Sequence, residues 1–197
     1  MLKKGTEIPT IDVAMVTIKP SVGKNEIALT TANKIGVEVL EETEEGVKLI
    51  VKGVLIAQKG EETTITGHNI TLTDNVFNFE LAKIIQGGKI LYWASAEKTA
   101  TQEEETEFGI AGYRPPVAGS KDKGEIFTLN AYSAIYDAAG LLKGYEKVSY
   151  PNCKGKPFGL NSEDGVFRVS EYTINSAPSD GQEPFELDLV DELPVVS

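Results

Sequence analysis

Apolar and polar residues alternate along most of this chain, and this period of two limits what the chain can fold into. A strand places successive side chains on opposite faces, so alternation is typical of strands that bury one face. Such runs occupy 11–20, 34–59, 61–74, 124–157 and 165–178. We therefore predict seven or eight antiparallel strands in a mainly β fold, an antiparallel β-sandwich or barrel with one short flanking α-helix.

The exception to the alternation is the helix, which we expect at about residues 78–86. Its apolar residues fall at helical spacing, at Leu81, Ala82, Ile84 and Ile85. Asn78 is a residue type that caps free backbone N–H groups, and Glu80 lies in the first turn, where the helix dipole favours an acid. Gly87 adopts without strain the left-handed conformation in which many helices end. These signals predict a helix of about two to three turns.

A long hairpin is predicted over residues 34–59, with its turn in the acidic run 43–46. After that turn, one face carries Val47, Leu49, Val51, Leu55 and Ala57. The other face also carries apolar residues, namely Ile50, Val54 and Ile56. A neighbouring subunit would cover this second face in a shared β-barrel, although burial of both faces inside one sandwich would explain the pattern equally well.

A β-bulge is predicted at Gly67, within the strand run 61–74. Ile65 has the opposite parity to Ile70 and Leu72, so the three residues would not share a face in a regular strand. One additional residue at Gly67 would bring them onto the same face.

Two segments are expected to extend from the single domain, which spans 1–197. Residues 94–124 have no clear period, and they are too many for an ordinary loop in a compact domain. We interpret them as an ordered arm that docks on another surface through Phe108, Ile110, Tyr113, Pro115 and Pro116. Residues 178–197 alternate weakly and predict an edge strand or a clamp on a neighbour.

Composition and charge exclude several classes of protein. The chain has 197 residues, of which 41% are hydrophobic, and this suits one domain. Its net charge of -11 argues against a protein that binds DNA through the phosphates. No apolar run has membrane-spanning length, and "MLKKGTEIPT" at the N-terminus lacks the apolar core of a signal peptide. We therefore expect synthesis in a cytoplasm and no membrane partner.

No catalytic, cofactor-binding or metal-binding residues are predicted, and we expect no enzyme. The sequence contains no GxxxxGK loop, GxSxG elbow, HExxH motif or EF-hand loop. The single cysteine, Cys153, excludes an intramolecular disulfide, and His68 is the only histidine with which it could pair. The acidic run at 102–107 is interpreted as a solvated loop, because its consecutive side chains point in different directions.

Three segments resemble the major tail proteins of long-tailed, non-contractile bacteriophages. They are "VEVLEETEEGVKLIVKGVLIAQK" at 37–59, "GHNITLTDNVFNFELAKIIQGG" at 67–88 and "FRVSEYTINSAPSDGQEPFELDLVDELP" at 167–194. The likeness runs in order along most of the chain and is weakest across 94–124. It implies a tail-tube subunit that assembles into rings, usually of six, and the rings stack into a hollow tube for DNA ejection.

The resemblance also implies partners and a location. The partners are further copies of the chain, tape-measure, tail-tip and tail-completion proteins, and double-stranded DNA that passes through the lumen without specific binding. The location is the tail of the virion, after assembly in the bacterial host cytoplasm. Ile50, Val54 and Ile56 would then belong to the intersubunit barrel, and the arm at 94–124 would lie between rings. An acidic lumen suits this role, because a basic bore would hold the phosphates.

Other classes remain open at the level of sequence. A phage-derived bacteriocin would use the same tube without DNA. A monomeric carbohydrate-binding or adhesion β-sandwich is a further alternative, and an unrecognised enzyme is the least favoured. A sugar-binding module usually exposes clustered aromatic residues, whereas Tyr92 and Trp93 lie in an apolar run and are predicted to belong to the core.

Overall fold

The structure of the protein is a computed structural model, which describes residues 8–22, 25–52, 54–121 and 123–196. Most of the N-terminal segment that argues against a signal peptide, residues 1–7, lies outside the described residues. The described chain is mainly β with one helix, which confirms the predicted fold class. No helix in it has the length and apolar character needed to cross a membrane.

The main sheet has eight strands, and all of its pairings are antiparallel. Its order is β2-β1-β10-β11-β12-β6-β3, and β13 pairs with the same edge of β11 as β12 does. The strands are β1 (Thr10–Pro20), β2 (Ile27–Leu29), β3 (Ala32–Glu44), β6 (Glu62–Asp74), β10 (Phe127–Tyr136), β11 (Leu142–Gly155), β12 (Ser170–Ser176) and β13 (Glu186–Val190). Because β2 and β3 end the sheet, its described part is open and not a closed barrel.

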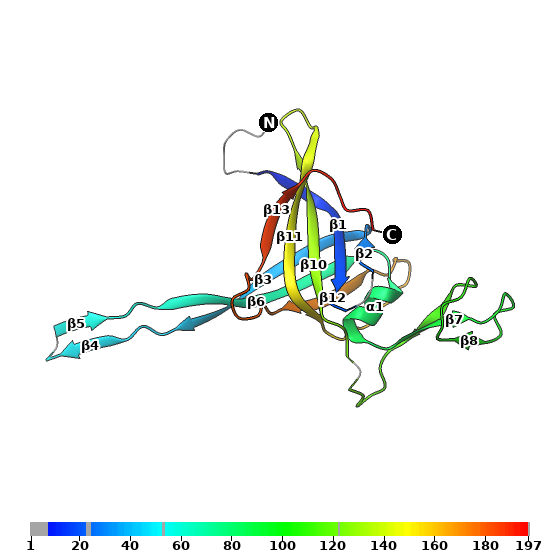
Figure 1. The fold of residues 1–197 in the computed structure, drawn as a ribbon, viewed down its shortest axis with the longest axis horizontal. Coiled ribbons are helices and arrows are strands. Elements are labelled where there is room, and N and C mark those ends of the chain that lie inside the picture. The colour runs from blue at the N-terminus through cyan, green and yellow to red at the C-terminus, as the bar shows by residue number, and fades with distance from the viewer. Residues whose placement is uncertain (1–7, 23–24, 53, 122, 197) are drawn as a thin grey trace.

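The sheet curls around an apolar core, and helix α1 (Phe79–Gln86) packs against it near β11 (Figure 1). Asn78 Oδ1 accepts hydrogen bonds from the backbone N–H groups of Glu80 and Leu81, at 2.9 and 3.0 Å. Gly87 has a φ of 83°, and its N–H donates to the carbonyl of Lys83. The four apolar residues predicted for the inner face of the helix are all buried. Both ends of the predicted helix and its buried face are therefore confirmed.

The predicted bulge in β6 is also confirmed. Leu40 pairs with Gly67 and Glu41 pairs with Ile65, so Thr66 is the additional residue. Ile70 and Leu72 are fully buried, whereas Ile65 is exposed. Ile65 thus continues the core-facing side of β6 into the part of the hairpin that extends beyond the core.

The hairpin is longer than predicted, and its predicted turn at 43–46 is wrong. β3 pairs with β6 along its whole length. The chain continues into β4 (Lys48–Val51) and reverses at Lys52, which has a φ of 49°, into β5 (Val54–Gln58). The reversal was missed because the alternation of apolar residues continues across it without a change of parity.

A second, three-stranded sheet has the order β8-β7-β9, and it includes part of the predicted arm. Its strands are β7 (Lys89–Trp93), β8 (Thr101–Gln102) and β9 (Ile110–Arg114). In Figure 1 it projects from the body on the side opposite the long hairpin. Tyr92 and Trp93 are half-buried, so the prediction that they belong to the core is wrong. At the C-terminus, β13 forms the predicted edge strand on β11.

Gly124 lies against the C-terminal end of α1, where an added Cβ would come within 2.0 Å of the carbonyl oxygen of Ile85. We expect Gly124→Ala to lower the free energy of unfolding by about 2 kcal/mol. The added methyl group would require the helix to shift, and the packed core resists that shift. Denaturant unfolding measures this change. Gly112→Ala is the matched control, since an added Cβ there meets nothing within 4 Å. Equal losses in the two variants would contradict the prediction.

Candidate assembly surface

The hairpin of β3 and β6 extends far beyond the core and carries β4 and β5 at its end (Figure 1). From the bulge at Leu40 to the reversal at Lys52 the chain runs for about 12 residues, or about 40 Å at the rise of a β-strand. Every residue of β4 is exposed. The outer part of the hairpin is therefore a two-stranded ribbon in solvent, and such a ribbon is at best marginally stable in water.

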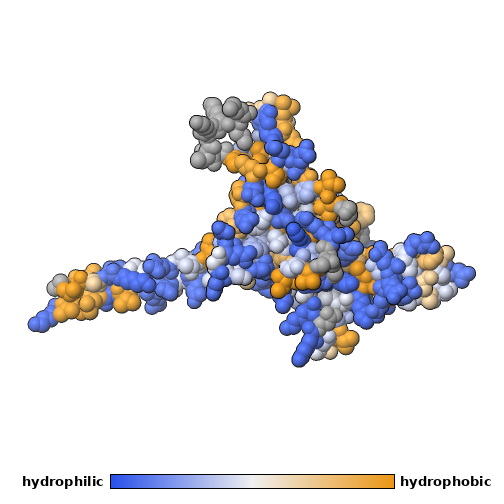
Figure 2. Space-filling model, in the orientation of Figure 1, coloured by the Kyte–Doolittle hydropathy of each residue, from blue (hydrophilic) through white to orange (hydrophobic). Residues whose placement is uncertain are grey.

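The end of this hairpin, residues 46–60, is named the tip, and it is apolar on both faces. Ile50 lies opposite Leu55, and Leu49 lies opposite Ala57 on the other face. Six apolar side chains of the tip are 48–68% exposed: Val47, Leu49, Ile50, Val51, Leu55 and Ile56. Figure 2 shows this apolar patch at the far end of the hairpin, beyond a hydrophilic stem. A contiguous exposed patch of this kind marks an interaction surface.

The structure places two of the three predicted barrel residues on the surface of the tip. Ile50 and Ile56 are exposed, whereas the side chain of Val54 lies outside the described residues. The prediction that these residues share one face is wrong. Ile50 lies opposite Leu55, and a register shift leaves Ile56 as the additional residue of a bulge. Their role in an intersubunit barrel stays a prediction.

The stem between the body and the tip is polar. Thr43 and Thr63 share a hydrogen bond of 3.0 Å between their hydroxyl groups. Where the stem meets the tip, the ammonium of Lys59 lies 3.3 Å from a carboxylate oxygen of Glu44 and 3.7 Å from one of Glu62. These charges are more than half exposed, so each ion pair contributes little to stability. The stem is suited to water, and the apolar tip is not.

The root of the hairpin is anchored by a buried aromatic cluster. His68 is 2% exposed, and its ring lies edge-on to Tyr150 and Phe185, with centroid distances of 5.2 and 5.8 Å. Burial lowers the pKa of His68, and Nδ1 has no hydrogen-bond partner among the described residues. Phe185 directly precedes β13, so this cluster also holds the C-terminal segment.

Cys153 is fully buried close to this cluster, and its thiol donates to the carbonyl of Tyr150 at 3.2 Å. Burial raises the pKa of Cys153 to about 12. A thiol with this pKa is protonated at neutral pH and is a poor nucleophile. The cysteine and the histidine are thus both core residues.

The predicted arm residues lie at the other side of the molecule from the tip (Figure 1). Tyr113 is tied to the body, because its hydroxyl donates to the carbonyl of Gly87. The other four are half-buried or exposed, namely Phe108, Ile110, Pro115 and Pro116. The structure therefore does not bring the arm residues and the barrel residues together within one subunit. Their predicted role between rings stays a prediction.

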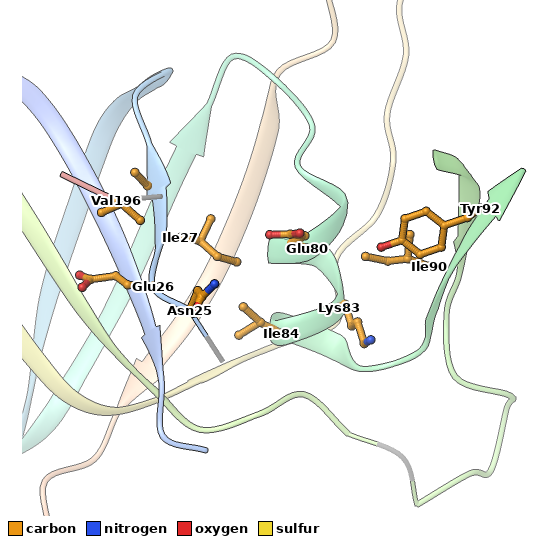
Figure 3. A pocket seen from close by; sticks show the side chains of 10 residues that line it. Asn25, Glu26, Ile27, Glu80, Lys83, Ile84, Ile90, Tyr92 and Val196 are labelled. Atoms are coloured by element: carbon orange, nitrogen blue, oxygen red, sulfur yellow. The ribbon is translucent and has the colours of Figure 1, made fainter. Parts of the chain in front are cut away.

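A groove of about 600 Å³ lies between β2, α1 and β7 (Figure 3). Ile27, Ile84 and Ile90 give it apolar walls, and Glu26 and Glu80 stand beside them. The sequence analysis missed this groove, because its lining comes from residues 25–28, from residues 80–92 and from Val196, which are far apart in the chain. Glu80 was noted there only for its place in the first turn of the helix.

No protein-family model matches this chain, and no curated protein matches it. Among solved structures, the chain is similar to one in the cryo-EM structure of an extracellular contractile injection system, the PVC sheath-tube complex in its extended state. The identity is 14%, the match covers 95% of each chain, and the TM-score is 0.41. A TM-score of 0.41 does not establish a shared fold, so the function proposed below depends on the chain's own surfaces.

The buried histidine makes stability depend on pH. The pKa of His68 lies below its ordinary value of 6.5, so the unfolded chain takes up the proton first as the pH falls. The contribution of neutral His68 to the free energy of unfolding is thus fully present above about pH 6.5 and is lost below that pH. We expect the free energy of unfolding of the wild type to fall between pH 7 and pH 5. The free energy of unfolding of the His68→Phe variant should fall less over that interval.

Guanidinium unfolding of both proteins at both pH values measures the difference. The other titrating groups are common to the two proteins and largely cancel in the comparison. The same loss in wild type and variant would show that His68 does not contribute.

Proposed function

We propose that this chain is a structural subunit of a phage-type tail tube, which assembles through its hairpin into stacked, hexameric rings that conduct DNA. The observation that carries the proposal is the apolar tip, whose far end lies about 40 Å from the bulge at Leu40 and which nothing described in its own subunit covers. Burial of this patch on another subunit would stabilise association by the hydrophobic effect. The sequence resemblance to major tail proteins supports a tube as the product.

The shape of the subunit supports repeated head-to-tail contacts. The tip lies at one end of the long axis, and α1 and the β8-β7-β9 sheet lie toward the other (Figure 1). A contact between two different surfaces is heterologous, and it generates a ring or a helical filament instead of closing as a dimer. A tube built of stacked rings requires contacts of this kind.

The solvent face of β3, β6 and β12 is assigned to the bore. The amide of Asn175 donates to Asn69, and the amide of Asn69 donates to the carboxylate of Glu38, so polar groups cross all three strands. Glu171 and three threonines alternate with the core residues on this face, and Lys34 lies at its end. Hydroxyl and carboxylate groups do not bind phosphates tightly. Retention of duplex DNA by assembled tubes at moderate salt would contradict the assignment.

The described surface does not favour a carbohydrate-binding module. The exposed aromatic residues Tyr136, Phe167 and Phe185 lie on separate segments, and Phe185 packs against His68. Sugar-binding surfaces instead cluster their aromatic rings. A structural role also agrees with the burial of Cys153 and His68, which removes both from contact with a substrate.

Charged substitutions in the tip test the proposal. We expect Ile50→Glu and Ile56→Glu each to abolish assembly, because a carboxylate would have to be buried without a partner. Both side chains are exposed in the subunit, so the folded monomer should keep its circular dichroism spectrum and melting temperature. Electron microscopy and sedimentation measure assembly.

Phe167→Glu is the matched control, since Phe167 is 95% exposed and lies outside the hairpin. Normal tubes from both tip variants would contradict the proposal. Loss of assembly in the control variant alone would place the interface elsewhere.

Hydrogen exchange tests the contact surfaces without substitution. We expect fast exchange in residues 47–59 and 94–124 of the free subunit, because these segments contribute little to the core. Exchange in both segments should slow by more than about tenfold on assembly, while the core strands stay protected in both states. Protection of 94–124 that is equal in both states would remove the arm from the contact between rings.

A further inference from the structure

The tip differs in charge from the rest of the chain. Residues 46–60 contain Lys48, Lys52 and Lys59 and no acidic residue, and of these lysines Lys59 is paired with Glu44 and Glu62 of the stem. The rest of the chain holds 16 basic residues (19 less 3) and all 30 acidic residues, a net charge of -14. The tip is therefore both apolar and basic, and the surface that receives it should be both apolar and acidic.

The groove between β2, α1 and β7 has this character (Figure 3). Its apolar lining comes from Ile27 and from the small exposed edges of Ile84 and Ile90, which are 2% and 5% exposed. Glu26 and Glu80 outnumber Lys83 along it. Tyr92 also lines the groove, where burial raises its pKa and the negative charges of Glu105 and Glu80 raise it further. A second hollow of about 410 Å³ shares Ala28 and Glu80 with this groove, so the two are neighbours along α1, and together they are named the trough.

Another hollow of the described surface fits the tip poorly. It lies at Pro115 and Pro116 and is lined by Lys123 and Lys154, which would repel the lysines of the tip. Charge therefore selects the trough along α1 over the hollow at the two prolines.

We propose that the tip of one copy docks in the trough along α1 of the next copy. This inference rests on the proposed function, and it names the surface of the partner copy that completes the contact. Lys48 and Lys52 would face Glu26 and Glu80, and the apolar tip residues would cover the isoleucine walls. The tip and the trough lie on opposite sides of the body, so the tip cannot enter the trough of its own chain (Figure 1).

Cross-linking of mixed cysteine variants tests the contact. Val51→Cys places a thiol on the tip, and Asn25→Cys places one beside the trough, with no charge changed in either. Cys153 is buried and protonated, so it stays unreactive. A short bis-maleimide should link the two variants only when they are mixed and assembled. Pro115→Cys, in the hollow at the prolines, is the matched control, since it also changes no charge, and it should give at most about a tenth of the product.

A charge exchange gives a second, independent measurement. Lys52→Glu alone and Glu80→Lys alone should each raise the concentration needed for assembly by about tenfold. The two substitutions combined in one chain should restore it to within about threefold. Melting temperatures exclude loss of fold, and Glu26→Lys replaces Glu80→Lys if the helix proves unstable.

The outcomes separate the inference from the function on which it rests. Cross-links from Val51→Cys to Asn25→Cys, with rescue by the charge exchange, would establish the contact. Normal assembly with cross-links to Pro115→Cys, or with no rescue, would overturn the inference and leave the proposed function standing. Failure of the wild type to assemble at any concentration would overturn both. Binding of the monomer to phosphatidylglycerol vesicles through the tip, without these cross-links, would assign the tip to a membrane.

Discussion

The ribbon formed by β4 and β5 lies in water without a layer to cover either of its faces, and the proposed function depends on that exposure. Backbone hydrogen bonds within a two-stranded ribbon satisfy only the facing groups, and the side chains on both faces stay hydrated. The core lies at the opposite end of β3 and β6, where Ile70 and Leu72 are fully buried. Stability of the subunit therefore depends on the body, and the surface proposed for association lies in the hairpin.

Helix α1 links these two parts of the structure. Its inner face packs Leu81, Ile84 and Ile85 into the core of the curled sheet. Gly124 and Gly155 let the chain pass so close to Ile85 that any side chain at either position would collide with it. The helix is thus fixed tightly by the core, and Glu80, Lys83 and the edge of Ile84 line the trough. A trough built on a fixed element needs little reorganisation to receive a partner, which reduces the cost of binding.

Local signals were sufficient to predict several elements from the sequence. The helix was predicted because Asn78 and Gly87 act on the backbone within one turn, and the bulge was predicted because parity is a property of a few adjacent residues. The reversal at Lys52 was missed because the apolar alternation runs through it unbroken. The prediction that Trp93 is buried was wrong, because burial there depends on layers packed above the β8-β7-β9 sheet. The trough was missed because it forms only when distant segments fold together.

Net charge and the basic tip have opposite effects on association. Copies with a charge of -11 repel one another over distances of about a Debye length, some 10 Å at 0.1 M salt. This repulsion opposes every encounter in which two acidic bodies meet, which includes most wrong orientations. An encounter that brings the lysines of a tip toward an acidic trough is attractive instead. The long stem keeps the two acidic bodies apart while this contact forms. Charge would therefore select the head-to-tail orientation before the apolar contact is made, and the hydrophobic contact would then hold it.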